Sequence, residues 1–499
     1  MPARAKTSSR GSAQKRSSTK AAKKSAAGAK SAAAPKTGGS RTRITNYTTA
    51  LRWLYDHTDY ERMRLVRYNA TTFNLERMRR LLKALGNPEK QLRFAHVAGT
   101  KGKGSTVAML DSMLRACGYT VGSYTSPHLV DLRERIKING QMISHPALTD
   151  LFKLVKSKAR QMGNDPPTFF EIMTACAIRY FADEAVDLAI LETGLGGRLD
   201  STNVITPEIC GISHISLDHT NVLGDTIADI AAEKAGIFKK NIPAVSVEQV
   251  PAVVRVFRRR AEEVGTTIEF TGKEKEVEFS YRFEANRELG QHYRVCLAAD
   301  NGAFEHLAVP LPGEHQAHNC ALALAMLVKL RDRGFDLPEE KVIRGLAETQ
   351  LAGRMELAWE EPRVLLDAAH NGRSIQALIK AIGAHIPYDS LVMIFGCGQD
   401  KDIAGMFREV NLGADKVIFT RARSNPRAEE PADLLHRFNE QSGKMAQTAP
   451  KLEDALNLAV RAVSRDDLIC VTGSFYLVGE AKKYLANLAE KRSKEAVAE

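Results

Sequence analysis

A glycine-rich run between an apolar segment and a helical pattern has the residue types of a phosphate-binding loop. The run is Gly99-Thr100-Lys101-Gly102-Lys103-Gly104-Ser105. Glycines let backbone N–H groups face phosphate oxygens, and the start of the following helix adds positive potential. In such a loop Lys103 reaches the β- and γ-phosphates and Ser105 faces a magnesium ion. The spacing departs from G-x-x-x-x-G-K-[ST], because Val97 takes the first glycine position and Gly104 follows the lysine. A βα turn that binds nothing is therefore the alternative.

Polar residues suited to a cation follow three successive predicted strands. These strands cover residues 120–124, 186–192 and 208–217. Ser126 follows the first strand, Glu192 ends the second, and His219 follows the third. Open parallel sheets bind ligands at the C-terminal tips of their strands, so this order favours one site for a metal and a phosphate. Taken singly, a strand-terminal Glu is more often a salt-bridge partner or a helix cap, and a lone His is more often structural.

The residues around these motifs alternate between strand and helix patterns, which is typical of an α/β protein. Apolar spacing predicts helices at 51–54, 75–85, 107–114, around 233–236 and at 315–333, a strand at 94–97, and a β-rich segment at 266–310. A second set of strands is predicted at 364–367, 391–396, 416–420 and 468–473. We therefore expect two domains: an N-terminal parallel-sheet ATPase domain of P-loop type over residues 46–349, and a smaller Rossmann-like α/β domain over residues 350–490.

The net charge of +12 over 499 residues comes from one end of the chain. Residues 1–43 contain twelve Lys or Arg and no Asp or Glu, so the rest of the chain is neutral. With no large apolar residue after Met1, residues 1–45 are predicted to form a disordered basic tail. The tail either makes weak contacts with polyanions or is only a solvated extension.

Several classes of protein do not fit the composition. Seven cysteines without a C-x-x-C pair argue against a zinc ribbon and a disulfide framework, and indicate a reducing, cytoplasmic compartment. Apolar runs such as 321–328 are too short to cross a membrane. No convincing Ser/His/Asp or Cys/His arrangement for nucleophilic catalysis is present.

The chain resembles the folylpolyglutamate synthase and dihydrofolate synthase family, within the ATP-dependent Mur ligase superfamily. The resemblance rests on segments that occur in the family's order: HVAGTKGKGS (96–105), TSPHL (125–129), LETGLGGRLD (191–200), LDH (217–219), EKAGIF (233–238), LPGEHQ (311–316), DAAHN (367–371) and TGSFY (472–476). It covers roughly residues 47–487 and implies that the N-terminal domain is like a Mur ligase central domain. Together these segments are highly specific, although each singly is not.

The resemblance implies a role for each matching residue. ATP would be bound by Thr100, Lys101, Gly102, Lys103, Gly104, Ser105, Asn319, Arg354 and Asp367. Magnesium would be bound by Ser126, Glu192 and His219, and catalysis would depend on Lys103, His219, Lys234 and His370. Lys234 would be carbamylated, which turns an ammonium into a carboxylate-like group, whereas without the resemblance it would be an ordinary solvated lysine. The pterin would contact Thr72, Phe73, Asn74, Leu75, Thr168, Phe169, Phe170, Glu171, Leu199, Asp200 and Ser201.

The implied reaction is ATP-dependent formation of an amide between a (dihydro)pteroate or folate carboxylate and L-glutamate, through an acyl phosphate. Both first-glutamate addition and polyglutamylation are expected, in a monomer. Lys101 stands where the family usually has Asn, which adds a positive charge beside the phosphates. Ala368 replaces the usual Gly, a milder change that should preserve the strand tip. Two rival functions stay open: a Mur-type cell-wall amino-acid ligase, and a nucleotide-dependent nucleic-acid-binding protein that uses the basic tail.

Overall fold

The computed structural model describes residues 43–60, 72–163, 165–273, 278–284, 294–299 and 302–498. The predicted basic tail, apart from residues 43–45, and its polyanion contact lie outside these residues. Within them, no helix combines the length and the apolar character needed to cross a membrane.

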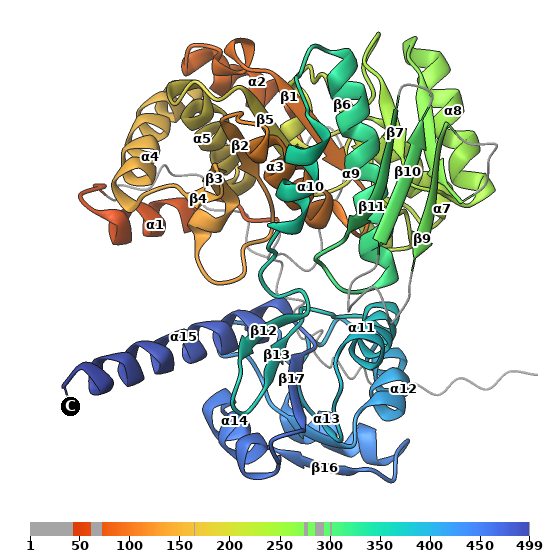
Figure 1. The fold of residues 1–499 in the computed structure, drawn as a ribbon. Coiled ribbons are helices and arrows are strands. Elements are labelled where there is room, and N and C mark those ends of the chain that lie inside the picture. The colour runs from red at the N-terminus through yellow and green to blue at the C-terminus, as the bar shows by residue number, and fades with distance from the viewer. Residues whose placement is uncertain are drawn as a thin grey trace, which may run out of the picture. The chain divides into compact units, whose positions relative to one another are not determined.

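The larger of two sheets has eleven strands, and the predicted phosphate-binding loop (residues 99–105, below called the phosphate loop) follows its central strand β1 (Figure 1). Its spatial order is β11-β10-β9-β8-β7-β6-β1-β5-β2-β3-β4. The strands are β1 (Phe94–Ala98), β2 (Val121–Tyr124), β3 (Ile136–Ile138), β4 (Gln141–Met142), β5 (Leu188–Glu192), β6 (Ile209–Ile212), β7 (Ala244–Ser246), β8 (Ile268–Gly272), β9 (Phe279–Glu284), β10 (Arg294–Ala299) and β11 (Gly302–Ala308). Seven neighbouring strands pair in parallel, in the spatial order β9-β8-β7-β6-β1-β5-β2. The strands outside them, β3 and β4 on one side and β10 and β11 on the other, pair antiparallel.

The parallel register brings four strand ends to one edge of this sheet. β1 lies between β5 and β6, and β5 separates β1 from β2, so the chain crosses over between neighbouring strands at this point. Val97 pairs with Glu192, and Ala98 pairs with Ile212. Ligands bind at such crossover points in open α/β sheets. The fold therefore places the segments after β1, β2, β5 and β6 next to one another.

Helices cover both faces of the larger sheet, because its central strands are apolar on both sides. One face packs against α3 (Lys103–Ala116), α9 (Glu314–Asp332) and α10 (Glu339–Ala347). The other face packs against α1 (Tyr47–Tyr55), α2 (Leu75–Ala84), α4 (His145–Ala159), α5 (Phe169–Asp183), α7 (Ile227–Ala235) and α8 (Pro251–Val264). Shorter helices are α6 (Thr220–Leu223), η1 (Pro88–Gln91), η2 (Leu132–Arg135), η3 (Arg160–Met162) and η4 (Ser201–Val204).

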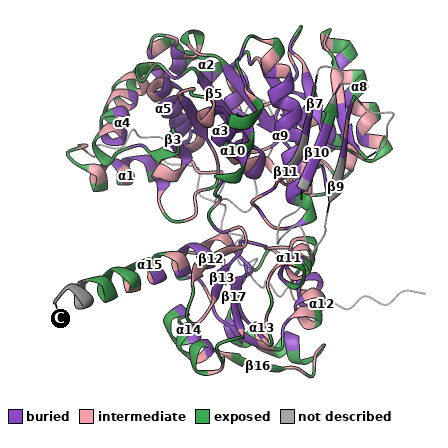
Figure 2. Cartoon of the chain, viewed as in Figure 1, coloured by how far each residue is buried: buried purple, intermediate pink, exposed green. Residues whose placement is uncertain are grey.

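The smaller sheet has six strands in the order β12-β13-β17-β14-β15-β16. The strands are β12 (Glu356–Trp359), β13 (Val364–Leu366), β14 (Leu391–Phe395), β15 (Lys416–Phe419), β16 (Met445–Thr448) and β17 (Leu468–Thr472). One face packs on α11 (Gly372–His385), α12 (Ile403–Gly413) and α13 (Pro431–Asn439), and the other on α14 (Leu452–Arg461) and α15 (Phe475–Ala498). In both sheets the central strands are buried, whereas the edge strands β4, β12 and β16 are exposed or partly exposed (Figure 2).

The predicted α/β fold class is confirmed, with one correction near the site. The strand predicted over 208–217 ends at Ile212, and residues 213–219 form a loop in which Lys101 and His214 make an isolated bridge. The apolar residues Ile215 and Leu217 extended the pattern beyond the true strand end. The boundary predicted between residues 349 and 350 stays a prediction.

Candidate active site

The loop after β1 presents a helix N-terminus that is open to an anion. α3 begins at Lys103, and its N-cap is Gly102, which has φ 96° and provides no side-chain cap. A Cβ at Gly102 would lie 2.1 Å from Asn319 Oδ1, so only glycine allows α9 to approach this closely. The first N–H groups of a helix have no partner within the helix, and they are the groups that bind phosphate. Asn319, predicted to contact ATP, therefore packs against the phosphate loop.

Two lysines meet at one carbonyl of this loop. Lys103 Nζ donates to Gly99 O at 3.2 Å, and Lys234 Nζ on α7 donates to the same oxygen at 2.8 Å. Lys103 Nζ also lies 3.7 Å from Glu192 Oε1. Burial, and after it the charge of Lys103, lowers the pKa of Lys234 to about 7. A substantial fraction of this buried amine is therefore neutral at neutral pH.

Two of the three predicted magnesium ligands lie together. Ser126 N donates to Glu192 Oε2 at 3.3 Å. Glu192 is 4% exposed, and burial raises the pKa of its carboxyl although Lys103 opposes this. A buried carboxylate oxygen with a hydroxyl at the next strand tip is a donor pair that suits Mg²⁺, which takes few protein ligands and keeps water or phosphate oxygens. These residues therefore fit a magnesium ion.

The third predicted ligand, His219, is linked to the phosphate loop by hydrogen bonds of the neighbouring residue, Asp218. His219 N donates to Asp218 Oδ1 at 3.0 Å, and Lys101 Nζ donates to Asp218 Oδ2 at 2.9 Å. His219 has φ 52°, in the left-handed region that few residues other than glycine adopt, and its side chain is 60% exposed. Strained backbone conformations of this kind occur at functional sites. No group of three His, Cys, Asp or Glu side chains in the described residues could hold a metal, so the complete ligand set stays a prediction.

The 213–219 loop is joined to the phosphate loop by its backbone as well. Thr100 N and Lys101 N donate to His214 O at 2.9 and 3.2 Å, and Thr100 Oγ1 donates to Ser216 O at 3.2 Å. Although burial alone would raise the pKa of Asp218, the Lys101 ammonium and His219 hold it below its usual value. Lys101 is thus occupied by an ion pair with Asp218, a partner that sequence reasoning did not assign.

Two predicted residues of the second domain lie beside Phe475: the ATP contact Arg354 and the catalytic residue His370. The Arg354 guanidinium lies 5.0 Å from the Phe475 ring, and the His370 ring lies 5.6 Å from it. Asp367 accepts from Met355 N at 3.0 Å and from Ala369 N at 2.9 Å, which shapes the turn after Arg354.

The imidazole of His370 is held as a neutral acceptor. Its Nδ1 lies 2.9 Å from Ala368 O, which can only accept, so the proton lies on Nδ1 and Nε2 has a free lone pair. Burial, and then the charge of Lys101, lowers the pKa of His370 to about 3.

Nine of the predicted ATP and magnesium residues line one cleft of about 1840 Å³. Its lining includes the predicted residues Lys101, Gly102, Gly104, Ser105, Ser126, Glu192, Asn319, Arg354 and Asp367. Thr100, Lys103, His219, Lys234 and His370 are not among the described residues that line it. The volume exceeds the 300–1,000 Å³ usual for a pocket with one small ligand, so there is room for more than one substrate. Residues of both sheets contribute to the walls.

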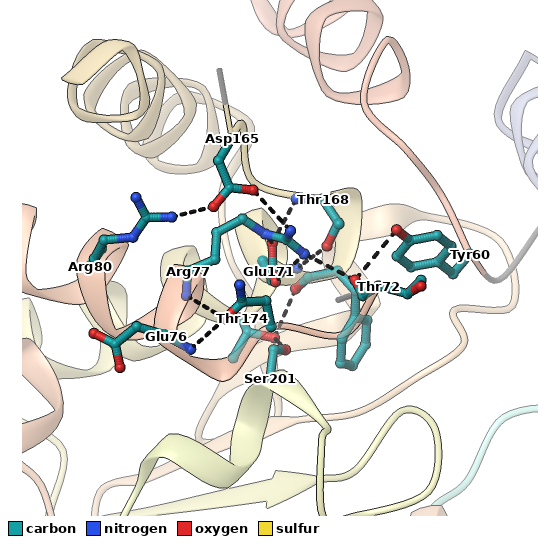
Figure 3. Close-up of polar contacts among 12 residues, drawn as sticks. Tyr60, Thr72, Glu76, Arg77, Arg80, Asp165, Thr168, Glu171, Thr174 and Ser201 are labelled. Carbon is teal, nitrogen blue, oxygen red and sulfur yellow. Dashed lines mark hydrogen bonds and ion pairs between the residues drawn. The ribbon is translucent and has the colours of Figure 1, made fainter. Parts of the chain in front are cut away.

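The predicted pterin contacts form a second group, and none of them lines this cleft in the described structure. They come from the segments 72–75, 168–171 and 199–201, which hydrogen bonds bring together (Figure 3). Thr72 O accepts from Arg77 Nη2 at 3.2 Å, while Thr174 Oγ1 lies 2.7 Å from Ser201 Oγ. The Phe170 ring packs so closely on Gly194 that a Cβ there would lie 2.4 Å from it.

Most polar groups in this second group already have protein partners. Asn74 and Thr168 cap α2 and α5. The Asp200 carboxylate accepts from Gly194 N and Leu195 N at 2.9 Å, from Thr202 N at 3.0 Å and from Thr202 Oγ1 at 2.6 Å. Four donors fill its usual acceptor positions. Asp200 therefore shapes the glycine segment after Glu192, and a direct pterin contact by this residue stays a prediction. Leu199 is half-buried, and Phe169 is 1% exposed within the core.

Sequence reasoning missed Arg77, although a signal for it was present. Met78, Leu81, Leu82 and Leu85 define the apolar face of α2, and Arg77 lies on that same face. A cation at a core position needs a buried partner. Its partners are Glu171 and Asp165.

Comparisons with known proteins give matches over most of the chain. Sequence models of the Mur ligase middle domain and of the Mur ligase glutamate ligase domain match residues 97–327 and 353–475. The chain is 36% identical to the dihydrofolate synthase/folylpolyglutamate synthase of Bacillus subtilis, over 82% of this chain and 94% of the relative. It is 33% identical to the folylpolyglutamate synthase of Lacticaseibacillus casei, over 83% and 95%. A solved structure of Escherichia coli FolC in complex with DHPP and ADP aligns with a TM-score of 0.77 at 30% identity, covering 89% of this chain and 99% of that one.

Proposed function

Because the chain belongs to the dihydrofolate synthase/folylpolyglutamate synthase family of Mur ligases, we propose that it joins a pteroate or folate carboxylate to L-glutamate at the expense of ATP. The observation that carries this proposal is the meeting of Lys103 and Lys234 at Gly99 O, beside the buried Glu192. The Lys103 ammonium and the Glu192 carboxyl group at an uncapped helix N-terminus suit the triphosphate of ATP and its metal.

The reaction has two steps. An oxygen of the substrate carboxylate attacks the γ-phosphorus of ATP, the bond to the bridging oxygen breaks, and ADP leaves with an acyl phosphate formed. The neutral amine of L-glutamate then attacks the acyl carbon, inorganic phosphate leaves, and the nitrogen loses a proton to give the amide. Carboxylates are poor acyl donors, so this activation is needed. No side-chain nucleophile takes part.

The residues of the phosphate loop stabilise the charge that develops in the first step. The N–H groups at the start of α3 and the Lys103 ammonium bind the phosphates, and Lys103 neutralises charge on the transferred group. Ser126, Glu192 and His219 are the ligands we assign to Mg²⁺, which when bound supplies further positive charge to the phosphate oxygens. Asn319 and Arg354 contact the nucleotide, and Asp367 fixes the turn that presents Arg354.

Lys234 is the residue we expect to be carbamylated. Its neutral amine attacks the carbon of CO2, an N–C bond forms, and one proton is released to leave an anionic carbamate. The lowered pKa of Lys234 favours this step because only the unprotonated amine reacts. The carbamate then places a negative group beside Lys103.

The tautomer of His370 gives this residue a role in the second step. With Nδ1–H donating to Ala368 O, Nε2 accepts a hydrogen bond from the incoming amine and orients it. The low pKa of His370 keeps this nitrogen unprotonated over the physiological range.

The acceptor is a pterin-bearing acid held by the segments 72–75, 168–171 and 199–201, and we assign both first-glutamate addition and polyglutamylation to the enzyme. We also propose a cytoplasmic monomer; the seven free thiols support a reducing compartment.

The test is an assay of L-glutamate-dependent ADP release with dihydropteroate, with tetrahydrofolate and with a UDP-linked sugar peptide, each product being identified by mass. We expect release with both pterin acceptors and none with the sugar peptide. ADP release with the sugar peptide alone would overturn the proposal in favour of a cell-wall ligase. ADP release with only one of the two pterin acceptors would limit the enzyme to one of the two proposed activities.

A further inference from the structure

Arg77 is a buried cation whose three guanidinium nitrogens all have acceptors. Its side chain is 8% exposed. Nε donates to Glu171 Oε2 and Nη2 to Glu171 Oε1, both at 2.8 Å. Nη1 donates to Asp165 Oδ1 at 3.1 Å, and Nη2 also donates to Thr72 O at 3.2 Å. Burial alone would lower the pKa of Arg77, but the carboxylates of Glu171 and Asp165 raise it, so the group is fully charged.

These bonds join two parts of the chain that are distant in sequence, residues 72–77 and residues 165–171. Figure 3 shows Arg77 reaching from α2 toward Glu171 in the first turn of α5, toward Asp165 before that helix, and toward Thr72. Glu171 Oε2 also accepts from Thr168 N at 2.8 Å, which completes the capping box of α5. A single guanidinium therefore links the segment that leads into α2 with the N-terminus of α5.

The aromatic residues around these bonds belong to the same assembly. Tyr60 OH donates to Thr72 O at 3.4 Å, and the Tyr60 and Phe73 rings lie 5.0 Å apart. Phe169 N donates to Thr58 O at 3.0 Å. Arg77 therefore lies next to the point where the backbone segments around Thr58, Thr72 and Thr168 contact one another.

The chemistry of the pair explains what it supplies. A buried ion pair adds little net stability compared with apolar residues of the same volume, because both charges lose their hydration. Its planar, bidentate geometry does fix both the distance and the mutual orientation of the two partners. Arg77 and Glu171 therefore supply position rather than stability.

We propose that Arg77 is a positioning residue for the pterin end of the substrate: it holds segment 72–75 against the start of α5 so that the two segments form one binding wall. The inference rests on the proposed function, because it concerns the acceptor of that reaction. The hydrogen-bond partners of Arg77 are Thr72, Asp165 and Glu171, and none of them lines the cleft beside the phosphate loop. We therefore expect nucleotide binding to change little when Arg77 is replaced.

The experiment compares Arg77→Lys, Arg77→Met and the double variant Arg77→Met/Glu171→Met with the wild type. Arg79→Met is the matched control, because Arg79 lies on the same helix but its side chain is 55% exposed. Binding of dihydropteroate in the presence of ADP, and of ADP alone, is measured by calorimetry, together with KM, kcat and the melting temperature.

We expect Arg77→Lys to weaken dihydropteroate binding by about 10- to 100-fold, since small misplacements of binding groups cost this much. ADP binding should change by less than about twofold, as for independent sites, and kcat at saturating substrate should fall less than KM rises. If Arg77→Met unfolds, the double variant removes both buried charges and should recover the melting temperature without recovering dihydropteroate binding.

Three results would overturn the inference. Unchanged dihydropteroate binding in Arg77→Lys would show that Arg77 does not position the pterin. An equal loss of ADP binding would also contradict the inference, because it would indicate a purely structural role. Recovery of dihydropteroate binding in the double variant would show that the ion pair is not what positions the wall. A wild-type protein that binds ADP but neither binds dihydropteroate nor uses it would instead overturn the proposed function.

Discussion

The phosphate side and the pterin side of the protein use buried charge in opposite ways. Around Gly99 O, Lys103 and Lys234 have few protein partners, and burial has shifted the pKa values of Lys234 and Glu192 toward their neutral forms. Around Arg77, the charged groups are saturated with partners from the protein itself. Perturbed pKa values concentrate where chemistry occurs. The difference supports the proposed roles, in which the first region reacts with substrate and the second gives the proposed binding wall its shape.

The two regions share one segment. Glu192 ends β5 on the phosphate side, and eight residues later Asp200 closes the glycine segment by accepting from Gly194 N and Leu195 N. Phe170, from the pterin side, packs on Gly194. The same short stretch of chain therefore sets the position of the metal-site carboxylate and of the pterin wall.

The largest effect is expected from Lys103→Ala on the phosphate side. It removes a charge aimed at the transferred phosphoryl group, so kcat should fall about 10³-fold, the upper range for loss of one such group. The measurement is L-glutamate-dependent ADP release. Lys90→Ala, an exposed lysine on η1, is the control and should leave kcat unchanged. A Lys103→Ala protein with normal ADP release would remove this lysine from the mechanism.

Lys234→Met should lower kcat by about 10²-fold, because it removes the carbamate that we propose beside Lys103. The direct measurement is carbon NMR with ¹³C-bicarbonate, in which the wild type shows a carbamate signal and the variant does not. Lys239→Met is the control, since Lys239 is another lysine that donates to a carbonyl, Asn203 O at 3.1 Å. A wild type with no carbamate signal contradicts the assignment even if the variant is inactive.

The same lysine gives a pH dependence of stability. In CO2-free buffer the pKa of Lys234 is about 7 in the folded protein and about 10.4 in the unfolded chain, so unfolding takes up a proton between these values. The unfolding free energy of the wild type, relative to Lys234→Met, should therefore rise with pH above 7, by roughly 1 kcal/mol per pH unit. Below pH 7 the difference should be flat. Urea denaturation at several pH values measures it, and a difference that falls with pH would show that the amine is not buried as a free base.

Asp200→Asn should act on the pterin side and on stability. The amide replaces one carboxylate oxygen by a donor that faces backbone N–H groups, which should cost roughly 3 kcal/mol and raise the KM for dihydropteroate more than that for ATP. Urea denaturation and steady-state kinetics measure the two effects. The control is Asp187→Asn, where the carboxylate accepts from Thr120 N at 2.7 Å at the protein surface. Equal changes in both KM values would remove the distinction between the two sides.

Sequence patterns could predict the phosphate side better than the pterin side, for a physical reason. Glycines, a lysine and polar strand ends occur at fixed offsets from apolar strands, so the positions of Lys103, Ser126 and Glu192 follow from the sheet. The Arg77–Glu171 pair joins residues 94 positions apart and depends on how α2 and α5 pack. The prediction that the strand reaches residue 217 was wrong, because the loop that packs on the phosphate loop is apolar and has the sequence pattern of a strand.

The smallest effect is expected from Lys101→Asn. The Lys101–Asp218 ion pair is partly exposed, at 36% and 31% of the side chains, so its loss costs no more than about 1 kcal/mol after solvent screening. Removing a positive charge beside the phosphates should raise the KM for ATP by about two- to fivefold at low salt, and the difference should vanish at about 1 M salt, where the Debye length is short. Asp218→Asn should act in the opposite direction, because it frees the Lys101 ammonium to face the nucleotide. The same change in KM for both variants would mean that the pair acts by holding the 213–219 loop in place, and not through its charge.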